Sequence, residues 1–493
     1  MNRARSFPLH LLSLGVALAA CGGSDDVPSD LPESSYAAHC ASPRSGIDPT
    51  TNKAYTDVAG SVLDEELWIR AWTNDLYLWY REVPDPDVKG FATSLDYFDV
   101  MKTSATTASG KPKDQFHFTY KTSDWIALAG SGVEASYGVQ WALLATRPPR
   151  ELVVAFVEPG SPAAAAGLDR GAEVKSIDGV DLVNGSDVDT LNNGISPANV
   201  NETHTFVVVD RGSTTPRTVM LTSASITSVP VQNVHTLPAP NDKVGYFLFN
   251  DHIATAEKGL FDAVTQLRDA QITDLVLDIR YNGGGYLDIA AQLAYMIAGP
   301  TRTTGKVFER ESFNDKHQTI DPFSGRPLEP SFFVDQTVGF STLPPGQALP
   351  HLDLSRVFVL TGPGTCSASE AVMNGLAGVG VQVIQIGATT CGKPYGFFPA
   401  DNCGTTYFSI QFEGVNDKGF GDYADGFTPG GVNTGCVVPD DFGHPLGDPA
   451  EGRLAAALGF RANQACPAAP ALATRGAEVI PKSNWRQNRI LRR

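Results

Sequence analysis

The sequence lacks the short motifs that mark common metal and nucleotide sites. No two cysteines have the Cys-x-x-Cys spacing, no HExxH pattern occurs, and the histidines and cysteines do not cluster along the chain. A structural zinc ion needs several such ligands close together, so no metal site is expected. The glycines at 283–285 are not followed by Gly-Lys-Ser or Gly-Lys-Thr, so they do not predict a phosphate-binding loop. No cofactor is therefore expected.

Basic charge is also scarce. Charged residues make up 18% of the 493 residues, and 37 Lys and Arg stand against 54 Asp and Glu, which gives a net charge of −17. This excess of negative charge repels a phosphate backbone, so nucleic acid is not expected as a partner. The hydrophobic share of 42% predicts a folded chain, long enough for two or three domains.

The apolar run near the N-terminus is too short to predict a membrane-spanning helix. SFPLHLLSLGVALAA, residues 6–20, follows the basic MNRAR, which is typical of an export signal. LAACG at residues 18–22 resembles the lipobox of bacterial lipoproteins. That resemblance implies a lipid on Cys21 and a place in the cell envelope, at the periplasmic face of the outer membrane. An ordinary signal peptide with an incidental cysteine is the alternative.

Cysteine is rare, but its number is informative. Besides Cys21 there are six, and an even number in an exported protein predicts disulfides, although the sequence does not select among the many pairings. A disulfide between Cys391 and Cys403 is favoured, because these two cysteines could flank a hairpin. The six are Cys40, Cys366, Cys391, Cys403, Cys436 and Cys466.

Two segments before the middle of the chain have contrasting patterns. Residues 62–83 place apolar side chains at three- and four-residue spacing, which predicts a helix, and LDYFDVMKT starts another. The aromatic residues of the first helix predict a packed core, with a ligand-stacking surface as the alternative. From about residue 124 to 228, short β-type runs alternate with Gly, Pro and Asn.

Part of this β-type region resembles a PDZ domain. PGSPAAAAGLDRGAEVKSIDG, residues 159–179, is similar to the second half of that family. The resemblance implies that a loop before a strand holds the C-terminal carboxylate of a peptide, which adds as a further strand. A generic β-rich domain is the alternative. The residues that match the carboxylate-binding loop are Tyr137, Gly138, Val139 and Gln140.

From about residue 243, strands and helices alternate, which predicts an α/β domain with a largely buried sheet. Ser367 lies where the strand RVFVL runs through a glycine loop into the helical pattern SASEAVMNGLAG. Ser367 and Glu370 have the spacing of a capping box, so a purely structural helix cap is one interpretation. No Gly-x-Ser-x-Gly surrounds Ser367, so an α/β-hydrolase is not expected.

Three stretches, in order, resemble the carboxyl-terminal processing proteases, peptidase family S41. They are LDIRYNGGG (277–285), SASE (367–370) and CGKPYG (391–396). The resemblance implies that Ser367 is a nucleophile and Lys393 its general base. It also implies a multidomain α+β fold: an α/β (crotonase/ClpP-like) protease core, an inserted β-rich PDZ-like domain and a helical N-terminal region.

The chemistry explains why these residue types belong together. A serine hydroxyl attacks once a base removes its proton, and lysine is a known substitute for histidine in that role. Lys393 must then be neutral, which requires an apolar pocket that lowers its pKa. Tyr395, Phe397 and Phe398 are expected to supply part of it. The amides expected to hold the oxyanion are those of Ala368, Gly284 and Gly285.

Other residues near these motifs are expected to have supporting roles. Phe397 stands where the family often has a glutamine that orients the lysine. His252 is interpreted as a structural histidine, with a catalytic base as the alternative. Arg280 and Glu370 are expected to pin the glycine loop and cap the helix. The candidates to replace the glutamine are Gln382, Gln385 and Asn402.

The sequence therefore predicts an exported serine endopeptidase acting on protein or peptide substrates, anchored to a membrane through Cys21. A non-catalytic protein that binds peptides or apolar ligands on the same scaffold is the alternative, and a structural envelope lipoprotein would leave the three motifs unexplained. The oligomeric state is left open. The predicted segments are a signal peptide (1–21), a flexible tether (22–55), a helical region (56–123), a PDZ-like domain (124–228), the protease core (229–466) and a basic tail (467–493).

Overall fold

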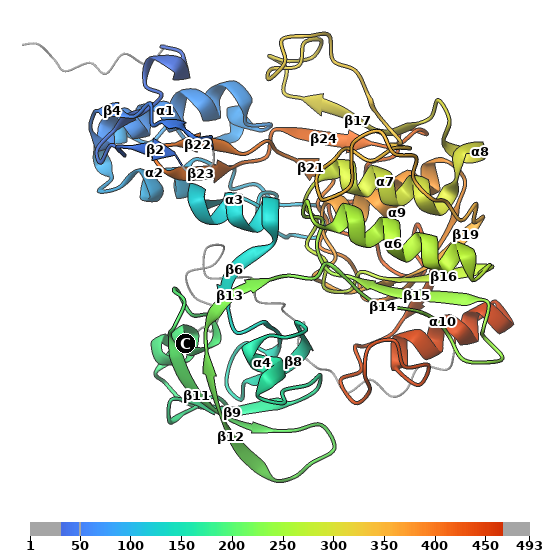
Figure 1. The fold of residues 1–493 in the computed structure, drawn as a ribbon. Helices are drawn as coiled ribbons and strands as arrows, with labels where there is room; N and C mark the ends of the chain where they lie inside the picture. The colour runs from blue at the N-terminus through green and yellow to red at the C-terminus, as the bar shows by residue number, and fades with distance from the viewer. Residues whose placement is uncertain (1–30, 49–50, 467–493) are drawn as a thin grey trace, which may run out of the picture.

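The computed structural model describes residues 31–48 and 51–466. The predicted signal peptide, Cys21 and the basic tail lie outside the described residues. The described chain forms an N-terminal unit (blue), a β-rich unit (cyan and green) and a large α/β unit that continues to red (Figure 1). Across the described residues, none of the helices combines the length and apolar character needed to span a bilayer.

A six-stranded sheet forms the centre of the α/β unit, in the order β14-β15-β16-β19-β20-β25. The strands from β15 to β25 are parallel, and β14 is an antiparallel edge. Both β15 and β16 are buried along their whole length, as strands covered on both faces must be. The strands are β14 (Val231–Thr236), β15 (Val244–Phe249), β16 (Asp274–Asp278), β19 (Arg356–Thr361), β20 (Gln382–Gly387) and β25 (Thr434–Val437).

Helices cover both faces of this sheet, so the predicted α/β alternation is confirmed. One apolar cluster joins the sheet to three helices, and a second cluster joins the other face to α10 (Gly452–Asn463). Parallel strands end at one edge, so the loops after β16 and β19 meet there. The three helices on the first face are α6 (Ala256–Asp269), α7 (Leu287–Ala298) and α9 (Ala368–Gly378).

A smaller sheet lies beside this unit, in the order β18-β17-β24-β21. Its strand β17 packs against α9, where the ring of Phe308 fills the space over Gly375. The strands are β17 (Val307–Phe313), β18 (Ser331–Phe332), β21 (Tyr395–Gly396) and β24 (Phe412–Val415).

The β-rich unit has its own sheet, in the order β12-β11-β9-β8-β7, with β10 paired to β9, and its own apolar core. The boundary predicted at residue 124 falls inside a helix, α3 (Thr122–Ser131), so the two-stranded ribbon of β6 and β13 is where the unit begins and ends. The elements are β6 (Val133–Ser136), β7 (Val139–Ala145), β8 (Glu151–Val157), α4 (Pro162–Ala165), β9 (Glu173–Ile177), β10 (Val180–Asp181), α5 (Val188–Ile195), β11 (Thr203–Val209), β12 (Pro216–Thr222) and β13 (Ala224–Thr227).

The N-terminal unit contains both predicted helices, α1 (Val62–Leu76) and α2 (Ser94–Val100). Trp68 and Trp72 of α1 stack on one another and pack against Tyr407. The prediction that these aromatic residues form a core is therefore confirmed. Tyr407 comes from the far end of the chain, in a sheet of β5 (Phe118–Lys121), β22 (Ala400–Asn402) and β23 (Thr405–Phe408).

The prediction of a flexible tether up to residue 55 is wrong for the part that the structure describes. Cys40 is fully buried and bonded to Cys403, and the Ala38 amide donates to Asn402 Oδ1. The Gly, Ser and Pro content indicated a tether, whereas contacts to a segment 363 residues away hold this stretch in place. Its elements are a 3₁₀ turn (Glu33–Ser35), β1 (His39–Cys40), β2 (Ile47–Asp48), β3 (Lys53–Ala54) and β4 (Val58–Ala59).

The prediction of disulfides is confirmed, but the favoured pairing of Cys391 with Cys403 is wrong. Each of these cysteines has another partner, because the hairpin expected between them does not bring them together. The pairs are Cys40–Cys403, Cys366–Cys391 and Cys436–Cys466.

Candidate active site

Ser367 occupies a strained turn between β19 and α9. Its backbone angles are φ 57° and ψ −119°, outside the regions that residues with a side chain prefer. Such a conformation costs about 1–3 kcal/mol and is found mainly at functional sites. Gly284 lies directly against this turn, since a Cβ atom on it would come within 2.8 Å of the Ser367 Cβ. The glycine loop and the serine, separated in sequence, therefore meet as predicted.

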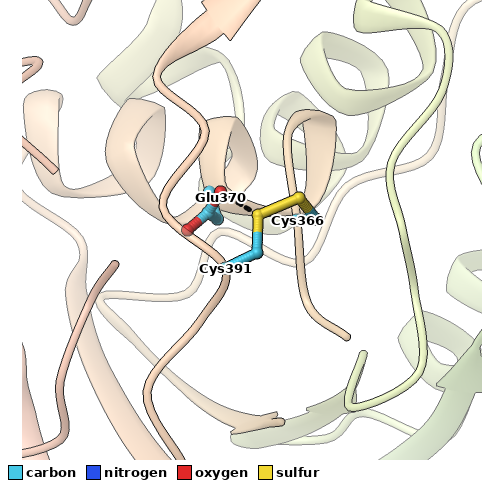
Figure 2. A group of neighbouring side chains, drawn as sticks. All are labelled: Cys366, Glu370 and Cys391. Atoms are coloured by element: carbon cyan, nitrogen blue, oxygen red, sulfur yellow. Dashed lines mark hydrogen bonds between the residues drawn. A yellow bond between two sulfur atoms is a disulfide. The ribbon is translucent and has the colours of Figure 1, made fainter. Parts of the chain in front are cut away.

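A disulfide lies beside this turn. It joins Cys366, the residue before Ser367, to Cys391, two residues before Lys393 (Figure 2). The Cys391 sulfur lies 3.4 Å from Glu370 Oε2. Among the described residues, this trio is the one group of three or more acidic, histidine or cysteine side chains whose donor atoms all lie within 4.8 Å of one another. Both sulfurs are bonded to each other, so they are not thiolate ligands for a metal ion.

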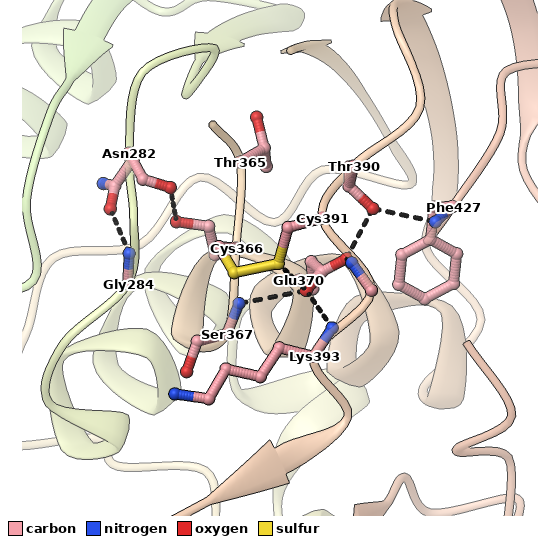
Figure 3. The surroundings of a disulfide bond; sticks show 12 residues. Asn282, Gly284, Thr365, Cys366, Ser367, Glu370, Thr390, Cys391, Lys393 and Phe427 are labelled. Atoms are coloured by element: carbon pink, nitrogen blue, oxygen red, sulfur yellow. Dashed lines mark hydrogen bonds between the residues drawn. A yellow bond between two sulfur atoms is a disulfide. The ribbon is translucent and has the colours of Figure 1, made fainter. Parts of the chain in front are cut away.

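The Glu370 carboxylate connects the serine and lysine segments. It accepts hydrogen bonds from the amides of Ser367 (3.0 Å), Gly392 (2.9 Å) and Lys393 (2.8 Å), and from the Thr390 hydroxyl (Figure 3). The carboxyl group is fully buried, and burial raises its pKa although these hydrogen bonds oppose the shift. The expectation that Glu370 caps the helix is correct, and the same carboxylate also holds the lysine segment.

Lys393 is 6% exposed, and its side chain extends towards Ser367 in Figure 3. The Lys393 Nζ atom lies 3.9 Å from the ring centre of Phe397 and 5.1 Å from that of Phe116. Phe397 therefore lies where the apolar pocket was expected. The ring of Tyr395, also expected in the pocket, packs on the ring of Trp79 with their centres 4.8 Å apart. Phe116 also lines the surroundings of Lys393, although no local pattern in the sequence indicated it.

Phe398, the third residue expected in the pocket, is 38% exposed and packs against Phe323. The candidates to orient the lysine also have other partners. Gln385 donates to Thr361 and to the Phe427 carbonyl, and Asn402 accepts from Ala38. Gln382 is exposed at the start of β20. The Phe397 ring thus lies over the amine at the position where the family often has a glutamine.

Asn282 holds the glycine loop in place. Its Oδ1 accepts from the Gly284 amide (2.9 Å) and from His252 Nδ1 (3.0 Å), while its carbonyl accepts from the Cys366 amide (3.1 Å). Since Oδ1 only accepts, His252 carries its proton on Nδ1. Burial lowers the pKa of His252 to about 3. His252 is therefore neutral and structural, as interpreted.

Three amides were expected to hold the oxyanion, and one of them already donates a hydrogen bond within the protein. The Gly284 amide donates to Asn282, which leaves Gly285 and Ala368 as the candidates. Ala368 is the first residue of α9, where backbone amides lack partners within the helix. Gly285 has a φ of 142°, and a Cβ there would come within 2.5 Å of the His252 carbonyl oxygen.

Arg280, in the stretch LDIRYNGGG, belongs to a fully buried ionic network. It donates to Asp278, Asp440 and Glu451 at distances of 2.6–3.0 Å. The expectation of a scaffold role for Arg280 agrees with this network, which fixes the end of β16 from which the glycine loop departs.

A residue of the β-rich unit reaches the same network. Arg170 is buried and donates to Asp440 Oδ1 and to the Tyr281 hydroxyl, both at 2.6 Å. Tyr281 precedes Asn282 in the chain, so one side chain of the β-rich unit contacts the base of the glycine loop. The sequence did not indicate that Arg170 and Asp440 pair, because an ion pair between residues 270 positions apart leaves no local pattern.

The four residues expected to bind a peptide carboxylate lie at the start of β7. Tyr137 is buried against Phe206, and Gly138 has a φ of 71° with its amide donating to Ser136. Val139 and Gln140 begin β7, which stands at the end of its sheet.

Comparison with known families gives two matches. Residues 243–397 match the model of peptidase family S41, and residues 64–120 match that of the peptidase S41 N-terminal domain. The first match contains the glycine loop, Ser367 and Lys393.

Comparison with individual proteins gives similar results. A carboxyl-terminal-processing protease of Picosynechococcus sp. is 29% identical over 177 residues, 34% of this chain and 40% of that protein. One of Synechocystis sp. is 30% identical over 135 residues, 27% of this chain and 31% of that protein. The chain therefore spans less than half the length of these curated relatives.

A solved structure shares the fold over most of its length. The crystal structure of a Bacteroides fragilis protein, described as a candidate S41 protease, superposes with a TM-score of 0.61 at 23% identity. The match covers 81% of this chain and 97% of that one.

Proposed function

Residues 64–120 and 243–397 match the models of the peptidase S41 N-terminal domain and of peptidase family S41, and from this premise we propose that the protein is a serine endopeptidase with Ser367 as nucleophile and Lys393 as general base. The observation that carries the proposal is the shared carboxylate. Glu370 binds the amides of Ser367 and Lys393 at once, so one buried group sets the position of both reacting residues.

The proposed reaction begins with transfer of the Ser367 hydroxyl proton to the neutral Lys393 amine. The serine oxygen attacks the peptide carbonyl, and the ammonium then gives its proton to the leaving amine. Burial of Lys393 favours the neutral amine, whereas the faces of Phe397 and Phe116 stabilise the ammonium that forms. The residue is thus suited to alternate between the two forms.

The developing oxyanion is assigned to the amides of Ala368 and Gly285. Donors that are already aimed at the developing charge are worth about 3–4 kcal/mol each in acyl transfer. The acyl-enzyme is then hydrolysed by water, with Lys393 again taking the proton.

Substrate recruitment is assigned to the β-rich unit, taken as a PDZ-like domain beside a crotonase/ClpP-like core. Support comes from the free end position of β7 and from the left-handed Gly138 ahead of it. A peptide that extends the sheet along β7 gains main-chain hydrogen bonds whatever its sequence.

The proposal includes export and a lipid anchor at Cys21, with the protein at the periplasmic face of the outer membrane. The three disulfides support this compartment, because such bonds persist where the surroundings are oxidising.

The test is labelling by a serine-reactive phosphonate together with casein digestion. We expect the wild type to be labelled, and both signals to fall at least about 1,000-fold in Ser367→Ala and Lys393→Ala. Two exposed residues, Ser312→Ala and Lys418→Ala, serve as matched controls and should behave as the wild type. An unlabelled wild type, or digestion that survives in Ser367→Ala, would contradict the assignment.

One observation favours the second candidate, a non-catalytic binding protein. Phe397 occupies the place of the family's orienting glutamine, and its ring covers the lysine amine. The same experiment separates the two functions, since a binding protein would retain peptides on a column without being labelled or cutting casein.

A further inference from the structure

We propose that Cys366 and Cys391 are positioning residues for the reaction, and that reduction of their disulfide by a dithiol lowers the catalytic rate. The inference rests on the proposed function, because it takes Ser367 and Lys393 as the reacting pair. The disulfide is the shortest covalent connection between them: one peptide unit separates it from the serine and two from the lysine.

The lysine segment depends on this connection. Residues 388–394 lie between the end of β20 and the start of β21 and contain no helix or strand. Segments without regular structure are the ones that open most readily. At its start, the amides of Ala388 and Thr390 donate to the carbonyls of Thr361 and Phe427. Nearer to Lys393, the segment is held by the Glu370 carboxylate and by the Cys391 amide, which donates to the Thr365 carbonyl at 3.0 Å. The disulfide adds a bond that local motion does not break.

The serine turn also benefits from the bond. Ser367 is held at a positive φ, so the chain must be fixed on both sides for that conformation to persist. On the helix side, α9 fixes it. On the other side stand the hydrogen bond from the Cys366 amide to the Asn282 carbonyl and the disulfide, which Figure 3 draws. Without the disulfide, two hydrogen bonds remain at Cys366 to resist relaxation of the turn: its amide donates to the Asn282 carbonyl, and its carbonyl accepts from the Ser369 amide.

The proposal also requires that a reductant reach the disulfide. Cys366 and Cys391 are both partly exposed. A dithiol attacks one sulfur through a mixed disulfide and then closes on itself, so two electrons and two protons pass to the protein, the S–S bond breaks and two thiols form.

The Cys391 thiol that reduction forms has a second effect on the site. The Cys391 sulfur already lies 3.4 Å from Glu370 Oε2 (Figure 2). Once reduced, it carries a proton that it can donate to this oxygen, which also accepts from the amides of Ser367 and Lys393. Reduction therefore removes a constraint and adds a competing donor at the group that aligns the reacting pair.

The other two disulfides provide matched controls. Cys40–Cys403 ties the first described residues to the turn before β23, and Cys436–Cys466 ties β25 to the segment after α10. Neither adjoins Ser367 or Lys393 in the chain. The variant in which these four cysteines are serine keeps only the disulfide at the site.

The experiment measures kcat and KM on a fluorogenic peptide, with phosphonate titration giving the number of active sites. On treatment of the four-serine variant with dithiothreitol, we expect kcat per titrated site to fall about 10-fold or more, since a displacement near 1 Å costs on the order of 100-fold. KM should stay within about 2-fold, because peptide recruitment lies elsewhere. Reoxidation with diamide should restore kcat.

Cys366→Ser/Cys391→Ser, with the other two disulfides intact, should start at the low kcat and respond no further to dithiothreitol. An unchanged kcat per site in this variant and in reduced wild type would overturn the proposal. A fall in melting temperature with kcat per site unchanged would assign the bond a structural role only and would also overturn it. A wild type that neither binds the phosphonate nor cuts any substrate would instead refute the proposed function.

Discussion

Two fully buried carboxylates, in different regions of the molecule, are held in opposite ways. Glu370, at the candidate active site, accepts from backbone amides and a hydroxyl, and burial raises its pKa. Asp440, where the β-rich unit meets the core, is surrounded by three arginines. Burial alone would raise its pKa too, but Arg170, Arg453 and Arg280 hold the pKa of Asp440 well below its usual range.

The comparison shows that the charge of the partners, more than burial, decides what a buried carboxylate does. Neutral donors fix the directions of hydrogen bonds while adding no charge next to Lys393. Arginines compensate the charge and resist separation of the two units, since breaking such a pair leaves a buried ion unpaired. The first arrangement suits alignment of a site, and the second suits an interface between units.

Glu370→Gln should have the largest effect, because it disrupts the hydrogen bonds from backbone amides to this carboxylate. The amide of glutamine brings two N–H donors to a place where donors already converge. We expect kcat per titrated site to fall about 100-fold, measured on a fluorogenic peptide. Glu413→Gln, an exposed glutamate on β24, is the control. A kcat within about 3-fold of the wild type would show that the shared carboxylate does not align the site.

Arg170→Met disrupts the cluster of arginines around Asp440. It keeps the length of the side chain and removes the charge between Asp440 and Tyr281. We expect the free energy of unfolding to fall by about 2 kcal/mol or more, as measured by chemical denaturation. Arg211→Met removes a partly exposed ion pair of the same unit and should cost less than about 1 kcal/mol. Equal losses in the two variants would contradict the importance of the buried network.

Measuring the free energy of unfolding against pH extends the comparison to buried histidines, whose protonated form is positively charged. Burial lowers the pKa of His252 to about 3 and that of His117 to about 4. A folded-state pKa below the ordinary value of about 6.5 means that stability is complete above pH 6.5 and is lost as the pH falls below it. Asp440 loses its contribution only below about pH 4. Burial raises the pKa of Glu66 and Glu158 to about 7 and that of Glu309 to about 8, so these groups change stability in the opposite direction between pH 6.5 and about 4.5. The contribution of one histidine is therefore measured as the difference between a variant and the wild type in this window.

In that window each buried histidine should cost about 1.4 kcal/mol per pH unit. His252→Gln is expected to change the slope of unfolding free energy against pH by about this amount relative to the wild type, while Ser312→Ala, at an exposed position, should leave it unchanged. If the slope of His252→Gln equals that of the wild type, His252 does not remain neutral in the folded protein.

Phe397→Leu should have the smallest effect. It keeps an apolar side chain beside Lys393 but removes the ring face 3.9 Å from Nζ, which is worth about 0.5–1 kcal/mol to an ammonium. The acid limb of the pH–rate profile should therefore move to lower pH by less than one unit. Phe323→Leu, which removes an exposed ring that packs on Phe398, is the control. A shift in the opposite direction would contradict this role of the ring.

The sequence by itself determined the features that arise from near neighbours. Apolar spacing predicted α1, and the alternation of strands and helices after residue 243 predicted a largely buried sheet, because each pattern reflects which face of one element meets the core. The spacing of Ser367 and Glu370 indicated a helix cap in the same way, whereas the resemblance of three ordered motifs to a known family indicated the glycine loop, Ser367 and Lys393.

Only the tertiary structure decided which distant segments meet. It paired Cys40 with Cys403 and so ordered a stretch whose composition indicated a tether, brought Phe116 to Lys393, and linked Arg170 to Asp440. The physical reason is that such contacts depend on the path of the whole chain through the sheet. A residue carries no mark of a partner hundreds of positions away, so the sequence indicated the candidate groups Ser367 and Lys393 but not the residues that pack around them.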